Sequence, residues 1–202
     1  NMKHIDVLSS YVSKPRSICQ VCHQARQHRS SFPTSMTCTS HIFEMIHIDL
    51  WGPYATPTYD GYKYFLTIVD DFSRATWTHL LSHKSNAFSI LKSFISFVQT
   101  QLQINIKIIR SDNGLEFSDQ TATAFYASHG IIHQTSCTGT PQQNGIVKRK
   151  HKHLLETARA LFFQSKVPIR FWGDCLLTAT YIINRMSSSI LQHRTPYEIL
   201  YG

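Results

Sequence analysis

The chain has 202 residues and a formal net charge of +8, and it contains twelve histidines that add positive charge wherever their pKa is raised. Its hydrophobic content of 42% and aromatic content of 12% exclude a disordered chain and predict one medium-sized folded domain with a small appendage. No apolar run reaches the roughly 18 to 20 residues of a membrane span, and residues 1–10 lack the apolar segment of a secretory signal. We therefore expect an intracellular protein whose partners are polyanions and not membranes.

The first 41 residues differ in composition from the rest of the chain. They are polar and irregular, contain Pro15 and Pro33, and include the basic stretch Arg26–Arg29. This composition predicts an appendage or linker over residues 1–41 and a folded core over residues 42–202.

Three apolar, β-rich runs follow in quick succession, at residues 43–50, 62–70 and 75–81. Glycine and proline residues between the first two runs are turn signals, and only a few residues separate the second run from the third. Three neighbouring strands with short connections predict an antiparallel meander.

The remainder of the chain alternates between helix and strand patterns. Apolar residues recur at three- and four-residue spacing from Phe88 to Leu102, which predicts a helix with one apolar face. The further elements are expected to be a strand at 104–110, a weaker helix at 118–129, a strand at 131–135, and helices at 143–163 and 168–186. Because strands that alternate with helices pair in parallel, the predicted fold is an α/β domain with a five-stranded mixed sheet flanked by helices.

Two aspartates stand at predicted strand ends. Asp49 closes the first strand, and Asp112 lies just past the fourth, before the turn residues Asn113 and Gly114. Ligands of open α/β sheets collect outside the carboxyl ends of strands, so both carboxylates are expected in one crevice. Carboxylates placed this way suit magnesium and phosphodiester chemistry. The alternative for each aspartate is a turn or capping residue.

Two other groups of residues suggest ligands. Cys19 and Cys22 have the spacing of half a tetrahedral zinc site, although two exposed thiols on a tail would look the same. The basic run Lys148–His153 lies on the predicted long helix, where successive cations can track DNA phosphates, and a polar loop precedes it. We predict nucleic-acid contacts for six residues in this region, with a solvated helix face and a helix cap as the alternative. They are Gln142, Gln143, Asn144, Arg149, Lys150 and Lys152.

Ordered, widely spaced motifs cover nearly the whole chain from Cys19 onward. They are His47–Pro53 (HIDLWGP), Ile68–Arg74 (IVDDFSR), Arg110–Phe117 (RSDNGLEF), Thr140–Val147 (TPQQNGIV), Arg149–His151 (RKH) and Thr195–Glu198 (TPYE). Together they resemble the integrase of copia-type LTR retrotransposon Pol polyproteins, in the family that includes retroviral integrases.

The resemblance implies a ribonuclease H-like fold and a catalytic triad of two aspartates and one glutamate. Asp49 and Asp112 match the two aspartates, but Lys148 stands at the glutamate position, because the chain has Gly-Ile-Val-Lys-Arg where the family carries Gly-x-x-Glu-Arg. Glu116 is too near Asp112 in sequence to replace it, and Glu156 lies about 12 Å further along the predicted helix.

An ammonium group at this position removes an oxygen donor and places positive charge where a cation should bind. We therefore expect weakened magnesium or manganese binding and an impaired enzyme. Lys148 is expected to pair with Asp49 or Asp112, or alternatively to lie in solvent with the basic run. Neither His47 nor Trp51 is expected to be catalytic.

The resemblance also implies that residues 1–41 are the remnant of an upstream zinc-binding module, in which His4 is a third candidate ligand.

The predicted function is DNA integration by polynucleotidyl transfer between the element's DNA ends and target DNA, by a homo-oligomer in the nucleus or a cytoplasmic particle. The main alternative is a non-catalytic nucleic-acid-binding remnant of a decayed element. A ribonuclease H-like nuclease with another substrate would need a third carboxylate that the chain does not offer.

Asp70 and Asp71 are expected to cap a turn and pair with Arg74.

Overall fold

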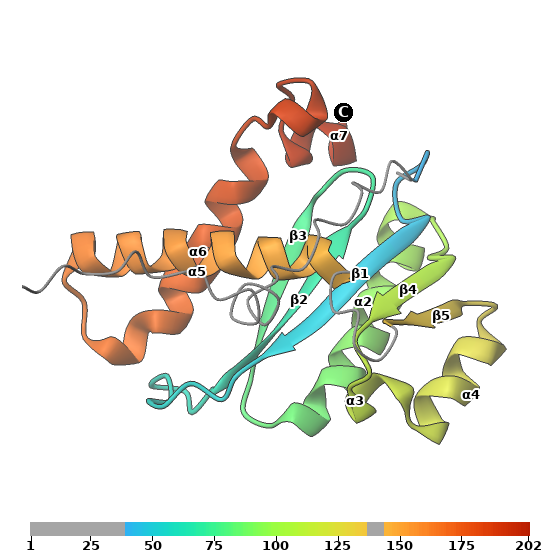
Figure 1. The fold of residues 1–202 in the computed structure, drawn as a ribbon, viewed down its shortest axis with the longest axis horizontal. Coiled ribbons are helices and arrows are strands. Elements are labelled where there is room, and N and C mark those ends of the chain that lie inside the picture. Colours follow the sequence, from blue (N-terminus) through green and yellow to red (C-terminus); the bar gives the residue numbers. More distant parts are fainter. Residues whose placement is uncertain (1–38, 137–143) are drawn as a thin grey trace, which may run out of the picture. The chain divides into compact units, whose positions relative to one another are not determined.

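The computed structural model describes residues 39–136 and 144–202, and its centre is a five-stranded mixed sheet (Figure 1). The strands are β1 (Met45–Trp51), β2 (Tyr64–Asp70), β3 (Thr76–Leu81), β4 (Ile108–Ser111) and β5 (Ile132–Thr135). Their order across the sheet is β3-β2-β1-β4-β5. The first three pair in antiparallel fashion, whereas β1–β4 and β4–β5 are parallel. Both the predicted meander and the predicted mixed sheet are confirmed.

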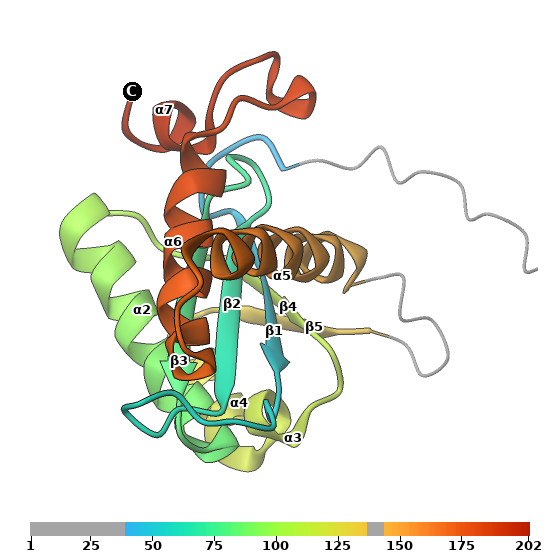
Figure 2. The same cartoon turned by 90° about the vertical axis from the view of Figure 1, so that its left-hand side faces the viewer.

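One face of the sheet is covered by α2 (Ala87–Leu102), with α3 (Leu115–Ser118) and α4 (Gln120–Ser128) beside it (Figure 2). The apolar stripe that predicted α2 is the stripe that is buried, because its spacing matches the helical repeat. Alternate residues of β1 and β2 point to this face and join the larger core, among them Ile46, Ile48, Leu66 and Ile68.

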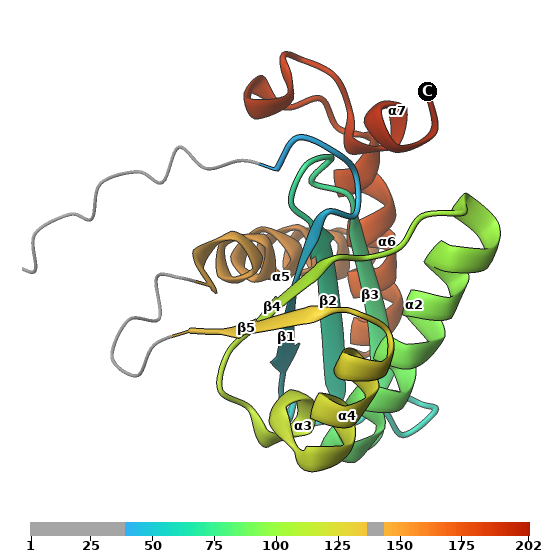
Figure 3. The same ribbon diagram turned by 90° about the vertical axis from the view of Figure 1, so that its right-hand side faces the viewer.

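The opposite face carries α5 (Gly145–Ser165) and α6 (Trp172–Arg185), as Figure 3 shows from the other side. A second core forms there from Phe65 of β2, Leu154 of α5 and Trp172 of α6. Gly173 allows α6 to approach closely, because a Cβ at this position would lie 2.8 Å from Leu80 Cδ1. Since side chains alternate along a strand, the residues of β1 that face α5 are His47, Asp49 and Trp51.

Several element boundaries differ from those expected. The helix expected at 118–129 is present as α4, but it begins at Gln120, because Asp119 has an extended backbone and its side chain accepts a hydrogen bond from the Ala122 N–H (2.7 Å). The short α3 before it was not predicted. The strand expected at 104–110 is shortened to β4, and Ile106 enters the core without strand pairing. The helix expected from residue 168 begins as a 3-10 turn, Ile169–Phe171.

Short elements at the carboxyl end were not predicted. A 3-10 turn covers Ser189–Leu191, and α7 spans Pro196–Tyr201. Thr195 and Glu198 form a reciprocal capping box at the start of α7, so the sequence did contain a signal for this helix.

The predicted boundary between residues 41 and 42 stays a prediction, because the first 38 residues lie outside the described range. Within the described part of the chain, none of the helices combines the length and the apolar character that a membrane span requires.

Candidate active site

The sheet register brings Asp49 and Asp112 to the same edge. β1 and β4 run parallel with His47 opposite Arg110, so each aspartate lies two residues beyond a paired position on its strand. Residues in equivalent positions on neighbouring parallel strands point to the same side. The Asp112 carboxylate is close enough for its charge to raise the pKa of Asp49. The geometry therefore brings the two carboxylates together as the sequence predicted.

Asp49 is held in a mostly buried environment, with 7% of its surface exposed. Its Oδ1 accepts a hydrogen bond from the Leu50 N–H at 3.1 Å. Burial, with a smaller effect of Asp112, raises the pKa of Asp49 to about 6, although the Lys148 charge and the Leu50 N–H oppose the rise. Such a carboxyl releases its proton near neutrality, a common property of groups at functional sites.

Asp112 is half-buried at the turn after β4, and its Oδ1 accepts a hydrogen bond from the Gly114 N–H at 3.0 Å. A Cβ at Gly114 would lie 3.0 Å from that same oxygen and 2.6 Å from Glu116 Oε2, so a larger residue here would require the Glu116 side chain to move. Glu116 itself pairs with Lys84 at 3.8 Å through its other oxygen.

Lys148 lies in the first turn of α5, and its side chain is exposed. Within the described residues it forms no direct ion pair, so the expected pairing with Asp49 or Asp112 is wrong. Its charge still lowers the pKa of Asp49 and contributes to the low pKa of His151. The side chain therefore acts on the site through space, because a long flexible lysine keeps its hydrated ammonium group in solvent.

The group that does approach Asp49 is His151, one helical turn after Lys148. His151 Nδ1 lies 3.5 Å from Asp49 Oδ2, and the ring meets Phe65 edge-on at a centroid distance of 5.3 Å. Burial, with a smaller effect of Lys148, lowers the pKa of His151 to about 4, so the ring is neutral at pH 7. His151 was not predicted as a site residue. Its place in the buried stripe with Val147, Leu154 and Ala158 was a usable signal.

Asn144 occupies a different place from the one predicted. It is completely buried, and its Nδ2 donates a hydrogen bond to the Ile48 carbonyl oxygen at 3.3 Å. A fully buried side chain does not contact DNA directly, so this part of the predicted nucleic-acid interface is corrected. Asn144 instead anchors the start of α5 to the strand that carries Asp49.

Polar atoms without a partner gather around Asp49. In the described residues, His47 Nδ1, Thr67 Oγ1, Asn144 Oδ1 and His151 Nε2 are buried and have no hydrogen-bond partner. Thr67 is the residue opposite Asp49 on β2, and the other three lie on β1 or the first two turns of α5. Two further unpartnered atoms in the described part of the chain, His79 Nε2 on β3 and Tyr126 Oη on α4, lie on other elements. Unsatisfied buried polar atoms cost stability, so the four near Asp49 call for an explanation such as a bound ligand, an ion or ordered water.

The predicted cations of α5 divide into two kinds. Arg149 and Lys152 are exposed, and Lys152 makes only a surface pair with Glu156 at 3.9 Å. Lys150 is half-buried, and burial together with the neighbouring Arg74 charge lowers its pKa to about 8. Arg149 and Lys152 are thus the better placed to meet phosphates. Gln142, Gln143, His4, Cys19 and Cys22 lie outside the described residues.

The turn after β2 behaves as expected. Asp70 accepts hydrogen bonds from the Ser73 N–H (2.8 Å) and hydroxyl (2.6 Å). Asp71 Oδ1 lies 3.3 Å from Arg74 Nη1 and 2.9 Å from His47 Nε2. Although burial raises the pKa of Asp71, the bonds from its neighbours outweigh burial and hold it below its ordinary value. Asp70 and Asp71 are therefore engaged in structural contacts, and His47 contributes its Nε2 to them.

The donor set fits a divalent cation poorly. Asp49 and Asp112 supply carboxylate oxygens, but the neighbouring Lys148 carries an ammonium group, and His151 presents Nδ1 to Asp49. In the parts of the chain that are described, no group of three or more His, Cys, Asp or Glu side chains is arranged to hold a metal ion.

Comparison with known proteins places the chain in a family. The model of the integrase core domain matches residues 40–141. The chain is 35% identical over 181 residues to the retrovirus-related Pol polyprotein from transposon TNT 1-94 of Nicotiana tabacum. It is 34% identical over 184 residues to that from transposon RE2 of Arabidopsis thaliana. These matches cover 90% and 91% of the chain but only 14% and 12% of the polyproteins.

Solved structures agree on the fold. The simian T-cell lymphotropic virus intasome in complex with PP2A regulatory subunit B56 gamma matches with a TM-score of 0.69 at 19% identity, covering 91% of this chain and 63% of that one. The HTLV-2 integrase catalytic core domain in complex with magnesium matches with a TM-score of 0.58 at 19% identity, covering 78% of this chain and 96% of that one. The ribonuclease H-like fold and the resemblance to copia-type retrotransposons are thereby confirmed, and the chain belongs to the integrase core domain family.

Proposed function

We propose that this domain binds DNA as the core of a retrotransposon integrase, and that Lys148 prevents it from carrying out metal-dependent strand transfer. The position of Lys148 carries the proposal. It lies one helical turn before His151, which approaches Asp49 at 3.5 Å, so residue 148 borders the two carboxylates.

The attachment of α5 to β1 explains why a substitution at residue 148 alone is enough to decide whether the site binds a metal ion. Asn144 and His151 hold the first turns of α5 against β1, so the backbone at residue 148 is already in place for a side chain that reaches the site. A carboxylate there would complete a set of three oxygen donors of the kind that magnesium and manganese accept. The HTLV-2 core domain, which shares this fold, was solved in complex with magnesium.

The test is calorimetric titration of magnesium and manganese into the unaltered chain and into Lys148→Glu, followed by a strand-transfer assay of both on short duplex DNA. Lys166→Glu is the matched control, because it makes the same charge change at an exposed position just past the far end of the same helix. We expect metal binding and strand joining only from Lys148→Glu.

Metal-dependent DNA cleavage by the unaltered chain, lost on Asp112→Asn, would refute the proposal. If Lys148→Glu binds metal but joins no strands while DNA binding persists, the domain is a non-catalytic nucleic-acid-binding remnant, and the exposed Arg149 and Lys152 would account for that binding. The partners we propose are the element's DNA ends, target DNA and further copies of the chain. The intasome and trimeric assemblies of the two fold relatives support assembly into oligomers.

A further inference from the structure

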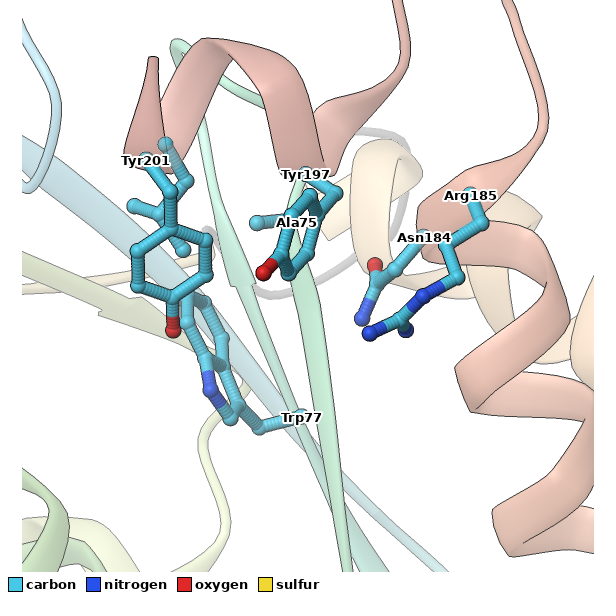
Figure 4. A pocket seen from close by; sticks show the side chains of 7 residues that line it. Ala75, Trp77, Asn184, Arg185, Tyr197 and Tyr201 are labelled. Atoms are coloured by element: carbon cyan, nitrogen blue, oxygen red, sulfur yellow. The ribbon is translucent and has the colours of Figure 1, made fainter.

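A small pocket lies where the start of β3, the end of α6 and α7 meet (Figure 4). Its volume is about 150 Å³, and it is open to solvent on one side. Trp77, Tyr197 and Tyr201 supply aromatic walls, and Arg185 closes one side. The pocket is at the β3 edge of the sheet, whereas Asp49 and Asp112 lie on β1 and after β4.

The walls of the pocket are held in place from several directions. Asn184 donates from Nδ2 to the Thr76 carbonyl oxygen (2.7 Å) and accepts from the Thr76 N–H (2.9 Å), which fixes the end of α6 to β3. Leu200 packs against the larger core, and the capping box at Thr195 fixes the start of α7. A site whose walls are already ordered pays less entropy when it binds a ligand.

Arg185 is the chemically distinctive group. Its guanidinium carbon lies 3.6 Å from the Tyr181 ring centroid and 4.6 Å from that of Tyr197, so both rings orient the guanidinium group. Nη1 donates to the Tyr181 carbonyl oxygen at 3.3 Å, and no carboxylate among the described residues pairs with Arg185. Stacking engages the faces of a guanidinium and leaves its remaining N–H edge free for in-plane hydrogen bonds to a carboxylate.

We propose that this pocket binds an acidic segment of a partner polypeptide, with one carboxylate on Arg185 and a neighbouring aromatic or aliphatic side chain against Trp77 and the wall formed by Tyr197 and Tyr201, whose ring centroids lie 4.9 Å apart. Among the described residues that line the pocket, Arg185 is the one cation, which matches one carboxylate, whereas nucleic-acid sites align several cations along successive phosphates. The pocket also has the volume of one projecting side chain. The exposed rings, at 43% for Tyr197 and 53% for Tyr201, supply the apolar contact.

The test titrates a blocked hexapeptide of alternating glutamate and phenylalanine into the full chain at physiological salt, which limits non-specific attraction to the basic protein. The same peptide with glutamine in place of glutamate is the control ligand. Binding is followed in ¹H–¹⁵N spectra through the indole N–H of Trp77, with Trp51 and Trp172 as internal references because both lie outside the pocket.

We expect the glutamate peptide to shift the Trp77 signal and the glutamine peptide to bind at least about tenfold more weakly, since a charged hydrogen bond is removed. Arg185→Gln should weaken binding by a similar factor, and Arg185→Lys should do so in part, because lysine keeps the charge without the planar fork. Arg159→Gln is the matched variant. Arg159 is also exposed and also bonds to the carbonyl oxygen four residues earlier (3.2 Å), but it lies on α5 away from the pocket.

Equal binding of the two peptides, or an equal loss with Arg159→Gln, would overturn the proposal in favour of non-specific attraction. A ten-nucleotide oligothymidylate that shifts the same Trp77 signal at lower concentration than the peptide would also overturn it, because the pocket would then be a nucleic-acid site. Arg185→Lys keeps the test decisive if Arg185→Gln fails to fold.

Discussion

At the scale of single residues, Asp49 and His151 make opposite contributions to the pH dependence of the free energy of unfolding. Burial raises the pKa of Asp49 to about 6, and burial lowers the pKa of His151 to about 4. The folded protein therefore holds the Asp49 proton and releases the His151 proton more readily than the unfolded chain. Below pH 7 the two effects act over nearly the same range and in opposite directions.

Single substitutions should separate the two effects. Because the folded-state pKa of Asp49 is raised, its contribution to the free energy of unfolding is full below pH 4 and falls by up to about 3 kcal/mol as the pH rises to 6. His151 has a lowered folded-state pKa, so its contribution is full above about pH 6.5 and is lost as the pH falls toward 4. Relative to the unaltered chain, Asp49→Asn should make stability rise more steeply between pH 4 and 6.5, and His151→Gln less steeply.

The measurement is urea unfolding at half-unit intervals of pH, with the free energy of unfolding of each variant compared to that of the unaltered chain. His83→Gln serves as the control, because His83 is exposed just before the 3-10 turn that leads into α2 and lies on a different element from Asp49 and His151. If both substitutions changed the slope in the same direction, the opposed pKa shifts of Asp49 and His151 would be wrong.

At the scale of elements, α5 connects the sheet to the site through its first two turns. Asn144 bonds to the Ile48 carbonyl oxygen, His151 approaches Asp49, and Leu154 enters the smaller core. The rest of α5 packs mainly against α6. The position of Lys148 therefore depends on an anchor that is local to the start of the helix.

Two substitutions of Asn144 should lower the free energy of unfolding by different amounts. Asn144→Ala removes a buried hydrogen bond and should lower the free energy of unfolding by about 1 to 2 kcal/mol. Asn144→Asp should cost more, because it buries a carboxylate oxygen against the Ile48 carbonyl oxygen with no donor between them. Urea unfolding at pH 7 measures both. Asn86→Ala should change stability little, because Asn86 is exposed at the N-cap of α2 and its side chain forms no capping hydrogen bond. An Asn144→Asp variant as stable as the unaltered chain would contradict the anchoring role.

At the scale of the whole molecule, a net charge of +8 favours polyanions, but the placement of the charges decides where they bind. Arg149 and Lys152 are exposed on the first two turns of α5, whereas Lys92 lies on α2, across the sheet from α5, and Lys107 lies before β4. Of these four cations, only the first pair lies on the helix whose His151 approaches Asp49.

The salt dependence of DNA binding should report this placement. Replacing Arg149 and Lys152 together by glutamine should reduce the slope of log K against log salt by about 0.9 for each phosphate that these side chains neutralise. Fluorescence anisotropy of a labelled duplex at several salt concentrations measures the slope. The Lys92→Gln, Lys107→Gln double variant removes the same charge and should leave the slope nearly unchanged, so an equal reduction would place the DNA elsewhere.

Much of the fold and part of the candidate site were predictable from the sequence, because those features depend on local patterns. Strand alternation and helical spacing predicted the five strands and the stripe that α2 buries. Strand ends predicted that Asp49 and Asp112 converge, since parallel neighbours end at one edge. The resemblance to copia-type integrases, and not a local pattern, predicts that Lys148 stands at the glutamate position. The boundaries that differed, at Asp119 and around Ile106, lie where a side-chain cap or core packing outweighed the local pattern.

The tertiary structure alone decided the features that join distant segments. Asn144 looks like an exposed loop residue in the sequence, yet it is buried because its amide meets a carbonyl group 96 residues away. The approach of His151 to Asp49 and the pocket around Arg185 likewise depend on how α5, α6 and α7 pack on the sheet. Contacts between residues far apart in the chain determine which side chains are buried and which groups they bind. A local sequence pattern does not specify which distant group a side chain will contact.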